Sequence, residues 1–193
     1  MPKTEVFNRT EVLKKASIAF NLKGYNGTSM QDLVDSTGLN RSSIYNSFGS
    51  KLDLFLECLS HYESDFQIEL NKLMLHSKSA MGLLHSILLN VVADSVYNKD
   101  RKGCLIGNCR TEMGKQNRRI DHFLIKNQSG TLTLLESIIN KGQDEGSINT
   151  KKSPSEYALY VFSNMQGLRS VGIFLDQEKE LNALVDTVLE SLK

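Results

Sequence analysis

The 193-residue chain has no tryptophan, only two prolines and only three cysteines. Proline breaks a helix from within, so a chain whose prolines are Pro2 and Pro154 is free to form long helices. The cysteines Cys58, Cys104 and Cys109 are odd in number and include no CxxC pair. A disulfide framework is therefore not expected, and the composition fits a reducing cytoplasm.

Targeting and membrane segments are also lacking. The opening residues MPKTEVFNRTEV have no apolar core of the kind that a signal peptide needs. No apolar run approaches the ~18 residues that a membrane-spanning helix requires. We therefore expect a protein that stays in the cytoplasm.

Recognisable catalytic and metal-binding motifs are absent. The sequence contains no GxSxG, P-loop, GxGxxG or HExxH pattern, and its four histidines lie apart without ligand spacing. Cys58 and His61 share a helix face, but nothing nearby completes a metal site, so packing explains them better. We expect no metal, no cofactor and no catalytic residues.

What the sequence does contain is helical periodicity. Hydrophobic residues are 40% and charged residues 23% of the chain, an ordinary globular profile, and no strand-like alternation is visible. These patterns predict an all-α protein of about nine helices, two of them short ones between residues 28 and 48. The other helices are expected at residues 7–23, 51–75, 81–97, 104–113, 116–142, 157–175 and 179–192. Ser50 is expected to cap the helix that contains Asp53 in its first turn, and Ser153, with Pro154 and Glu156, to cap the penultimate helix.

The stretch from Thr28 to Asp53 carries the densest set of helix signals. Thr28, with Gln31 in a capping box, is expected to start one short helix, and Gly38 to end it in a left-handed conformation. Asn40 is a strong cap for the next helix, in which residues 44 and 48 face inward. Two short helices joined by a tight turn predict a helix-turn-helix, whose second helix fits the DNA major groove.

The same stretch resembles the DNA-binding domain of the TetR family of transcriptional repressors. The resemblance rests on Phe20, Gly24 and Tyr25, on Thr28-Ser29 and Gly38, and on the ordered set Ile44, Tyr45, Phe48, Ser50, Lys51, Leu54 and Phe55. It implies a helix-turn-helix DNA-binding domain at residues 1–50 and a helical ligand-binding and dimerisation domain at 51–193. Ser42, Ser43, Asn46 and Ser47 depart from the family pattern at groove-facing positions, so the operator sequence does not transfer.

Residue chemistry and this resemblance together predict a DNA contact set. Arg41 and Asn46 have the groups for bidentate reading of guanine and adenine, and net charge of only +1 means that binding depends on local placement. Ser42 and Ser43 either reach DNA or merely start the helix. The resemblance implies backbone contacts from Tyr45 and Lys51. The remaining candidates, Thr28 and Ser29, stand at a helix N-terminus, where phosphate binds well.

The resemblance also implies a homodimer and a small-molecule effector that releases the operator. Apolar stripes on the last two helices, with Gly167 and Gly172 allowing close approach, favour a dimer there; a monomer with these stripes in its core is the alternative. The polar candidates Asn90, Asn108, Gln166 and Arg169 are as easily explained as satisfied core residues or interface contacts. The candidates are Tyr62, Phe66, Asn90, Cys104, Asn108, Phe123, Gln166 and Arg169.

Cys104 is a candidate sensor thiol. It follows a loop with Lys99, Arg101 and Lys102 and is expected in the first turn of a short helix, and cations and a helix N-terminus both favour the thiolate. Burial as a small apolar residue is the favoured alternative. A second alternative concerns the whole protein: a small helical enzyme with a Cys/His site, for example Cys104 with His122, and no DNA binding.

Overall fold

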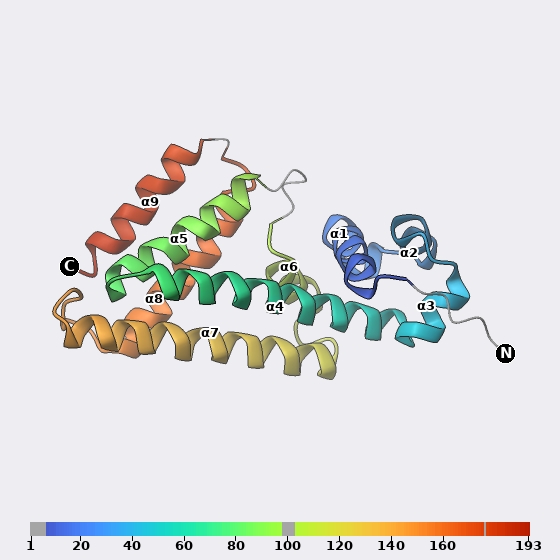
Figure 1. Ribbon diagram of the computed structural model, residues 1–193, viewed down its shortest axis with the longest axis horizontal. Helices are drawn as coiled ribbons and strands as arrows, with labels where there is room; N and C mark the ends of the chain where they lie inside the picture. Colours follow the sequence, from blue (N-terminus) through green and yellow to red (C-terminus); the bar gives the residue numbers. More distant parts are fainter. Residues whose placement is uncertain (1–6, 98–102, 176) are drawn as a thin grey trace. The chain divides into compact units, whose positions relative to one another are not determined.

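The computed structural model describes residues 7–97, 103–175 and 177–193, and every regular element within them is an α-helix (Figure 1). The predicted all-α class with about nine helices is confirmed for these residues. The helices are α1 (Arg9–Gly27), α2 (Met30–Thr37), α3 (Arg41–Phe48), α4 (Lys51–His76), α5 (Ala80–Tyr97), α6 (Leu105–Met113), α7 (Arg118–Asp144), α8 (Pro154–Val171) and α9 (Glu178–Glu190).

The start of α2 differs from the prediction. Ser29, not Thr28, is its N-cap, and the capping box is completed by Asp32 instead of Gln31. The reason is that the side chain of Thr28 is only 1% exposed and donates its hydroxyl to the carbonyl oxygen of Gly24 at 2.6 Å. The next residue therefore supplies the cap. The other predicted caps are confirmed at Asn40 and Ser153, and Gly38 is left-handed with φ 75°.

By contact density the chain forms two compact units. The N-terminal unit comprises Met1–Phe66 with Cys104–Asp121, and the C-terminal unit comprises Gln67–Gly103 with His122–Lys193. The chain therefore passes from one unit to the other three times, within α4, before α6 and within α7. The predicted division at residues 1–50 and 51–193 is a functional one and stays a prediction.

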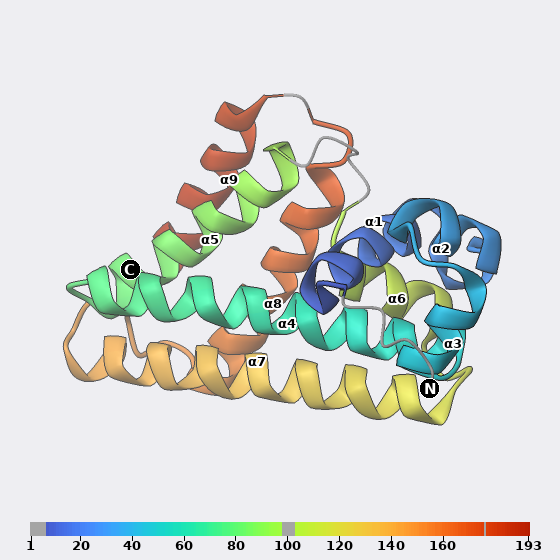
Figure 2. The same cartoon turned by 45° about the vertical axis from the view of Figure 1, so that its right-hand side comes forward.

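In the N-terminal unit, α1 is the central helix and packs on both α2 and α6 (Figure 2). Its buried side chains recur at helical spacing, among them Val12, Ala16 and Phe20. The Phe20 ring lies 4.7 Å from the Phe55 ring of α4 and 6.2 Å from the Tyr25 ring, between centroids. This aromatic cluster fixes α4 against the C-terminal end of α1.

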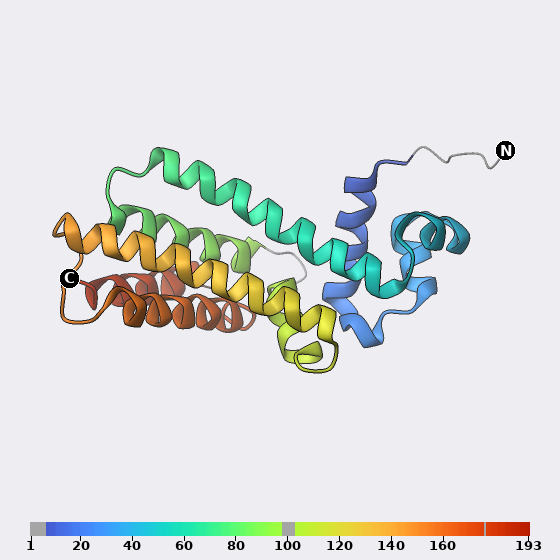
Figure 3. The same cartoon turned by 90° about the horizontal axis from the view of Figure 1, so that it is seen from below.

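In the C-terminal unit, α5 packs on α8 and α9 (Figure 3). The apolar run of α5 is buried, with Leu84 and Leu88 fully enclosed. Gly172 at the end of α8 lies so close to α5 that a Cβ there would stand 2.7 Å from Cβ of Ser95. Among the helices that the structure describes, none is long and apolar enough to cross a membrane.

Candidate nucleic-acid interface

The two helices of the predicted helix-turn-helix are capped at both ends of the turn. Gly38 donates its N–H to the carbonyl of Val34 at 2.9 Å and so closes α2. Asn40 then accepts the N–H of Ser43 at 2.8 Å and opens α3. Because the turn between them is only a few residues long, these local bonds set the direction of α3 relative to α2.

α3 has one buried face and one exposed face. Ile44 and Phe48 are 1% and 5% exposed, so they anchor the helix as predicted. Arg41, Ser42, Tyr45 and Asn46 are exposed, and Ser43 is half-buried. The exposed face therefore presents a guanidinium, an amide and two hydroxyls, which are the groups that read base edges and hold phosphates.

The remaining predicted contact residues lie around this face in different states. Ser29 is exposed at the start of α2, whereas the Thr28 hydroxyl is buried and turned toward Gly24. Lys51 is half-buried, and its ammonium nitrogen lies over the Tyr25 ring at 4.4 Å from the centroid. Burial lowers the pKa of Lys51 from its ordinary value. The Lys51 side chain is thus held in place by packing and by its cation–π contact with Tyr25.

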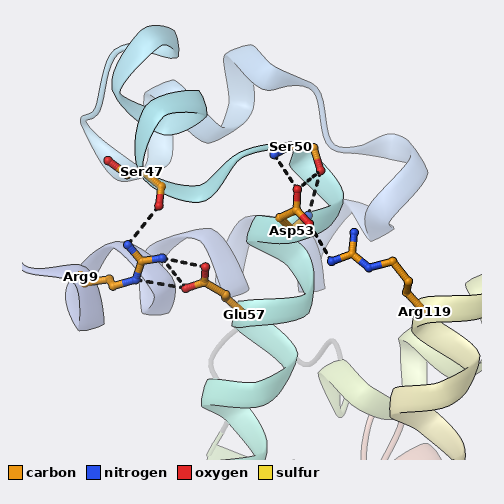
Figure 4. Close-up of polar contacts among 6 residues, drawn as sticks. All are labelled: Arg9, Ser47, Ser50, Asp53, Glu57 and Arg119. Atoms are coloured by element: carbon orange, nitrogen blue, oxygen red, sulfur yellow. Dashed lines mark hydrogen bonds and ion pairs between the residues drawn. The ribbon is translucent and has the colours of Figure 1, made fainter.

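Arg9 fastens α1 to the helix-turn-helix (Figure 4). Its Nη2 donates to both carboxylate oxygens of Glu57 at 2.7 Å, and Nη1 donates to the carbonyl of Ser47 at 3.2 Å. The guanidinium also lies over the Phe48 ring, 4.3 Å from the centroid. One side chain therefore ties α1 to α4 and to the last turn of α3. Sequence reasoning missed this role, since nothing near Arg9 in the chain signals it.

Asp53 makes a second tie at the start of α4. Its carboxylate accepts the N–H and hydroxyl of Ser50, as the predicted capping position requires, and also the guanidinium of Arg119 at 2.7 Å (Figure 4). Hydrogen bonds from Ser50, with help from Arg119, lower the pKa of Asp53 to about 2. Arg119 lies 66 positions along the chain in α7, too far for a sequence pattern to reveal the pair.

Helix α6 makes a third tie. Glu112 accepts the backbone N–H groups of Tyr25 and Asn26, both at 2.8 Å, and Asn108 donates to Asn21 at 2.9 Å. Asn108, predicted as a ligand residue, thus holds α6 to α1.

The other predicted ligand-site residues are divided between the units. Tyr62 and Phe66 lie on α4 within the N-terminal unit. In the C-terminal unit, Asn90 lies on α5, Phe123 on α7, and Gln166 and Arg169 on α8. All six side chains are half-buried. Their role in binding a ligand stays a prediction.

Cys104 is the N-cap of α6 and not a residue of its first turn. It is only 5% exposed, and its predicted cationic neighbours Lys99, Arg101 and Lys102 fall outside the described residues. Burial raises the pKa of Cys58 and of Cys109 to about 12, which makes both poor nucleophiles. Within the described residues no group of three or more His, Cys, Asp and Glu side chains could hold a metal.

The last two helices expose apolar groups beyond their packed faces. The apolar stripe of α8 is buried inside the C-terminal unit and consists of Tyr157, Val161, Met165, Leu168 and Gly172. Other apolar side chains remain exposed: Leu159 by 54%, Val171 by 39% and Phe174, just beyond the helix, by 81%. On α9, Leu184 is 44% exposed. Gly167 also faces open space, whereas Gly172 is used for packing on α5.

Comparison with known proteins agrees with this geometry. The profile of the family described as bacterial regulatory proteins, tetR family, matches residues 12–58. The chain is 27% identical over 159 residues to the HTH-type transcriptional repressor DhaR of Mycobacterium sp. (strain GP1), covering 82% of this chain and 79% of that protein. It is 34% identical over 110 residues to the repressor ComR of Escherichia coli (strain K12), covering 55% and 52%.

Solved structures share the fold over the whole chain. A cysteine mutant of the TetR family transcriptional regulator CifR, complexed with 26bp double-strand operator DNA, has a TM-score of 0.87 at 22% identity and covers 99% of this chain and 100% of that one. A TetR-family regulator from Agrobacterium tumefaciens has a TM-score of 0.86 at 16% identity, covering 95% and 96%. These relatives and neighbours are regulators and not enzymes.

Proposed function

Because this chain is a transcriptional regulator of the TetR family, we propose that it is a cytoplasmic repressor that binds a pseudo-palindromic operator as a homodimer and releases it when a small molecule binds. The observation that carries the proposal is α3, which is anchored by Ile44 and Phe48 and exposes Arg41, Tyr45 and Asn46. The named repressors among its relatives support the sign of regulation.

In this proposal, some residues contact base edges and others contact the DNA phosphate backbone. Arg41 and Asn46 read base edges, Ser42 and Ser43 lie beside them, and Tyr45 holds the backbone with Lys51. Ser29 adds a phosphate contact at the α2 N-terminus. Thr28 is left out of the side-chain contacts because its hydroxyl is engaged inside the protein.

Selection from random duplexes, followed by fluorescence anisotropy on the selected site, tests this assignment. Arg41→Ala should relax base preference at one position of each half-site and cost about 1–3 kcal/mol of discrimination. Lys51→Ala should weaken all sequences alike and reduce the salt slope by about one. Lys126→Ala, which removes an exposed charge from α7, is the matched control. Unchanged binding in both variants would remove α3 and α4 from the interface.

The homodimer is proposed through α8 and α9. Four large apolar side chains on or beside these helices, Leu159, Val171, Phe174 and Leu184, are exposed in the single chain, and burial against a partner would remove them from water. Gly167 leaves room there for a partner helix. Sedimentation at micromolar concentration should show twice the 21.7 kDa chain mass, and Phe174→Glu should lower it. A 21.7 kDa species in the unaltered protein would exclude the dimer.

The effector is proposed to bind inside the C-terminal unit, among the predicted residues Asn90, Phe123, Gln166 and Arg169, or to react with Cys104. Differential affinity for the DNA-free state of about 1–3 kcal/mol is what such coupling typically requires. A thermal-shift screen over hydrophobic drugs, quinones, aldehydes and acyl compounds, repeated with Cys104→Ser, separates the two routes. Quinone release of operator that survives in Cys104→Ser would leave this thiol a packing role only.

A further inference from the structure

The α1–α2 junction, meaning the last turn of α1 from Gly24 to Thr28, is held by a carboxylate of α6. At Gly24, φ is 73° and ψ is 169°, so the helical hydrogen-bond ladder of α1 is interrupted there. The backbone N–H groups that follow, of Tyr25 and Asn26, each donate to a separate oxygen of Glu112, Oε2 and Oε1, at 2.8 Å. Glu112 thus satisfies two backbone donors that the interrupted helix leaves over.

The fit around this carboxylate is close. A Cβ on residue 24 would stand 2.7 Å from Oε2 of Glu112, so the carboxylate occupies space that only a glycine leaves open. On the other side of the junction, the carbonyl of Gly24 accepts the Thr28 hydroxyl at 2.6 Å. Asn26 also donates its side-chain amide to the sulfur of Met113 at 3.5 Å.

This junction leads directly into the DNA-facing elements. Ser29, one residue after Thr28, is the N-cap of α2, and α2 continues through a tight turn into α3. The orientation of α2 and α3 on α1 therefore depends on the backbone that Glu112 holds. Glu112 itself lies on α6, which begins immediately after the chain enters the N-terminal unit at Cys104.

We propose that Glu112 is a positioning residue for operator recognition: its carboxylate latches the α1–α2 junction and so keeps α2 and α3 in the DNA-competent orientation. The proposal rests on the proposed function for its DNA readout, but the latch itself exists without DNA. A displacement of α6 would open it. The apparent operator affinity is then the affinity of the closed form multiplied by the fraction of molecules in which the latch is closed.

Glu112→Gln tests the latch with nearly unchanged side-chain volume. Glutamine keeps one acceptor oxygen, but its amide group faces the second backbone N–H, donor against donor. In the DNA-free variant, amide exchange at Tyr25 and Asn26 should approach the rate of unprotected amides, because the latch is then open in most molecules, and it should change little elsewhere in α1 and α2. Glu136→Gln, which removes an exposed charge from α7, is the matched control and should leave both amides unchanged.

The operator measurement separates positioning from contact and from general stability. With the selected duplex, Glu112→Gln should slow association about tenfold, with dissociation and the salt slope unchanged, because the bound contacts are the same. Its thermal midpoint should stay near that of the control, whereas a merely structural role predicts a lower midpoint and faster exchange throughout α1 and α2.

Each other result has a definite meaning. Unchanged exchange at the two amides, or loss of their protection with unchanged association, would overturn the positioning role. If the unaltered protein selects no duplex at all but Glu112→Gln still frees the two amides, the proposed function fails and the latch stands.

Discussion

The two units of the chain differ in the balance of interactions that stabilise each of them internally. The N-terminal unit has polar side-chain contacts between residues far apart in sequence: Arg9 with Glu57, Asp53 with Arg119, and Glu112 with the amides of residues 25 and 26. The C-terminal unit has a comparable tie, in which Glu145 accepts the backbone N–H of Ala80 at 2.7 Å across 65 positions. It depends more on the enclosed apolar side chains of α5 and on close helix approach, as at Gly172 against Ser95.

The difference matters because the two kinds of interaction do different work. Burial of apolar area supplies most of the free energy of folding and has no preferred direction. Hydrogen bonds and ion pairs contribute less net free energy but fix distances and angles. The N-terminal unit is thus built to hold short helices in one orientation, and the C-terminal unit to hold long helices together.

The largest expected effect comes from opening the apolar core of the C-terminal unit. Leu84 is fully buried on α5, so Leu84→Ala should lower the free energy of unfolding by about 2–5 kcal/mol through lost burial and a cavity. Urea titration followed by circular dichroism measures it. Ile125→Ala, at a 69% exposed site on α7, is the control and should change stability little. Equal losses would contradict the assignment of the core.

A smaller loss is expected where helices approach closely. Gly172→Ala places a Cβ 2.7 Å from Ser95 Cβ and 3.0 Å from the Leu168 carbonyl oxygen, and overpacking of this kind costs about 1–3 kcal/mol. Gly130→Ala is the matched substitution in α7, with nothing within 4 Å, and should stabilise the protein by up to about 1 kcal/mol. The thermal unfolding midpoint should therefore fall in Gly172→Ala and rise in Gly130→Ala.

Next comes a pair of capping boxes, one in each unit. Ser50→Ala and Ser153→Ala should each cost about 1 kcal/mol near neutral pH. Asp53 has a pKa of about 2 in the folded protein against 3.8 ordinarily, so its charged form is favoured by folding. That stability is present above about pH 4 and is lost as pH falls from about 4 to about 2.

The two capping boxes should differ in how their contribution to stability depends on low pH. Glu156 of the second box also has a lowered pKa, through Ser153, and within the part of the chain that the structure describes its ion pair is the local one with Lys152. Ser50→Ala should therefore flatten the acid dependence of stability and also loosen the Arg119 contact, as seen by exchange at the start of α4. Identical exchange in Ser50→Ala and unaltered protein would mean that Arg119 alone fixes Asp53.

The smallest expected effect is at Arg9. The Arg9–Glu57 pair is partly exposed, at 47% and 39%, so Arg9→Lys should cost at most about 1 kcal/mol, since lysine keeps the charge but not the fork-shaped contact. Arg118→Lys, at the exposed first residue of α7, is the control. High salt should reduce the difference in the free energy of unfolding between the Arg9→Lys and Arg118→Lys variants, because it screens the ion pair. A larger, salt-independent loss would show that the Phe48 contact dominates.

The fold and the recognition helix could be predicted because their signals are local. Caps at Asn40, Ser50 and Ser153, the left-handed Gly38 and the inward spacing of Ile44 and Phe48 each depend on residues within a few positions. Even there, the α2 cap was misplaced by one residue, because the burial of Thr28 depends on tertiary packing.

The contacts that orient the helices could not be predicted. Glu112 meets residue 25 across 87 positions and Arg119 meets Asp53 across 66, and a charged residue on an exposed helix face gives no sign of such a partner. The exposure along α8 could be predicted only in part: helical spacing places Leu159 off the stripe of Val161, but Phe162, also off the stripe, is buried by packing, whereas Leu159 is exposed.

The three chain passages between units have a consequence for engineering and for recombination between relatives. A chimera that joins the first 66 residues to another regulator's effector domain would bring α1 to α3 without the residues of α6 and α7 that fasten them. The other regulator's residues would then stand in place of Glu112, Asn108 and Arg119. A functional graft has to carry Cys104–Asp121 along as a second, separate insert, so the unit of exchange is a discontinuous module.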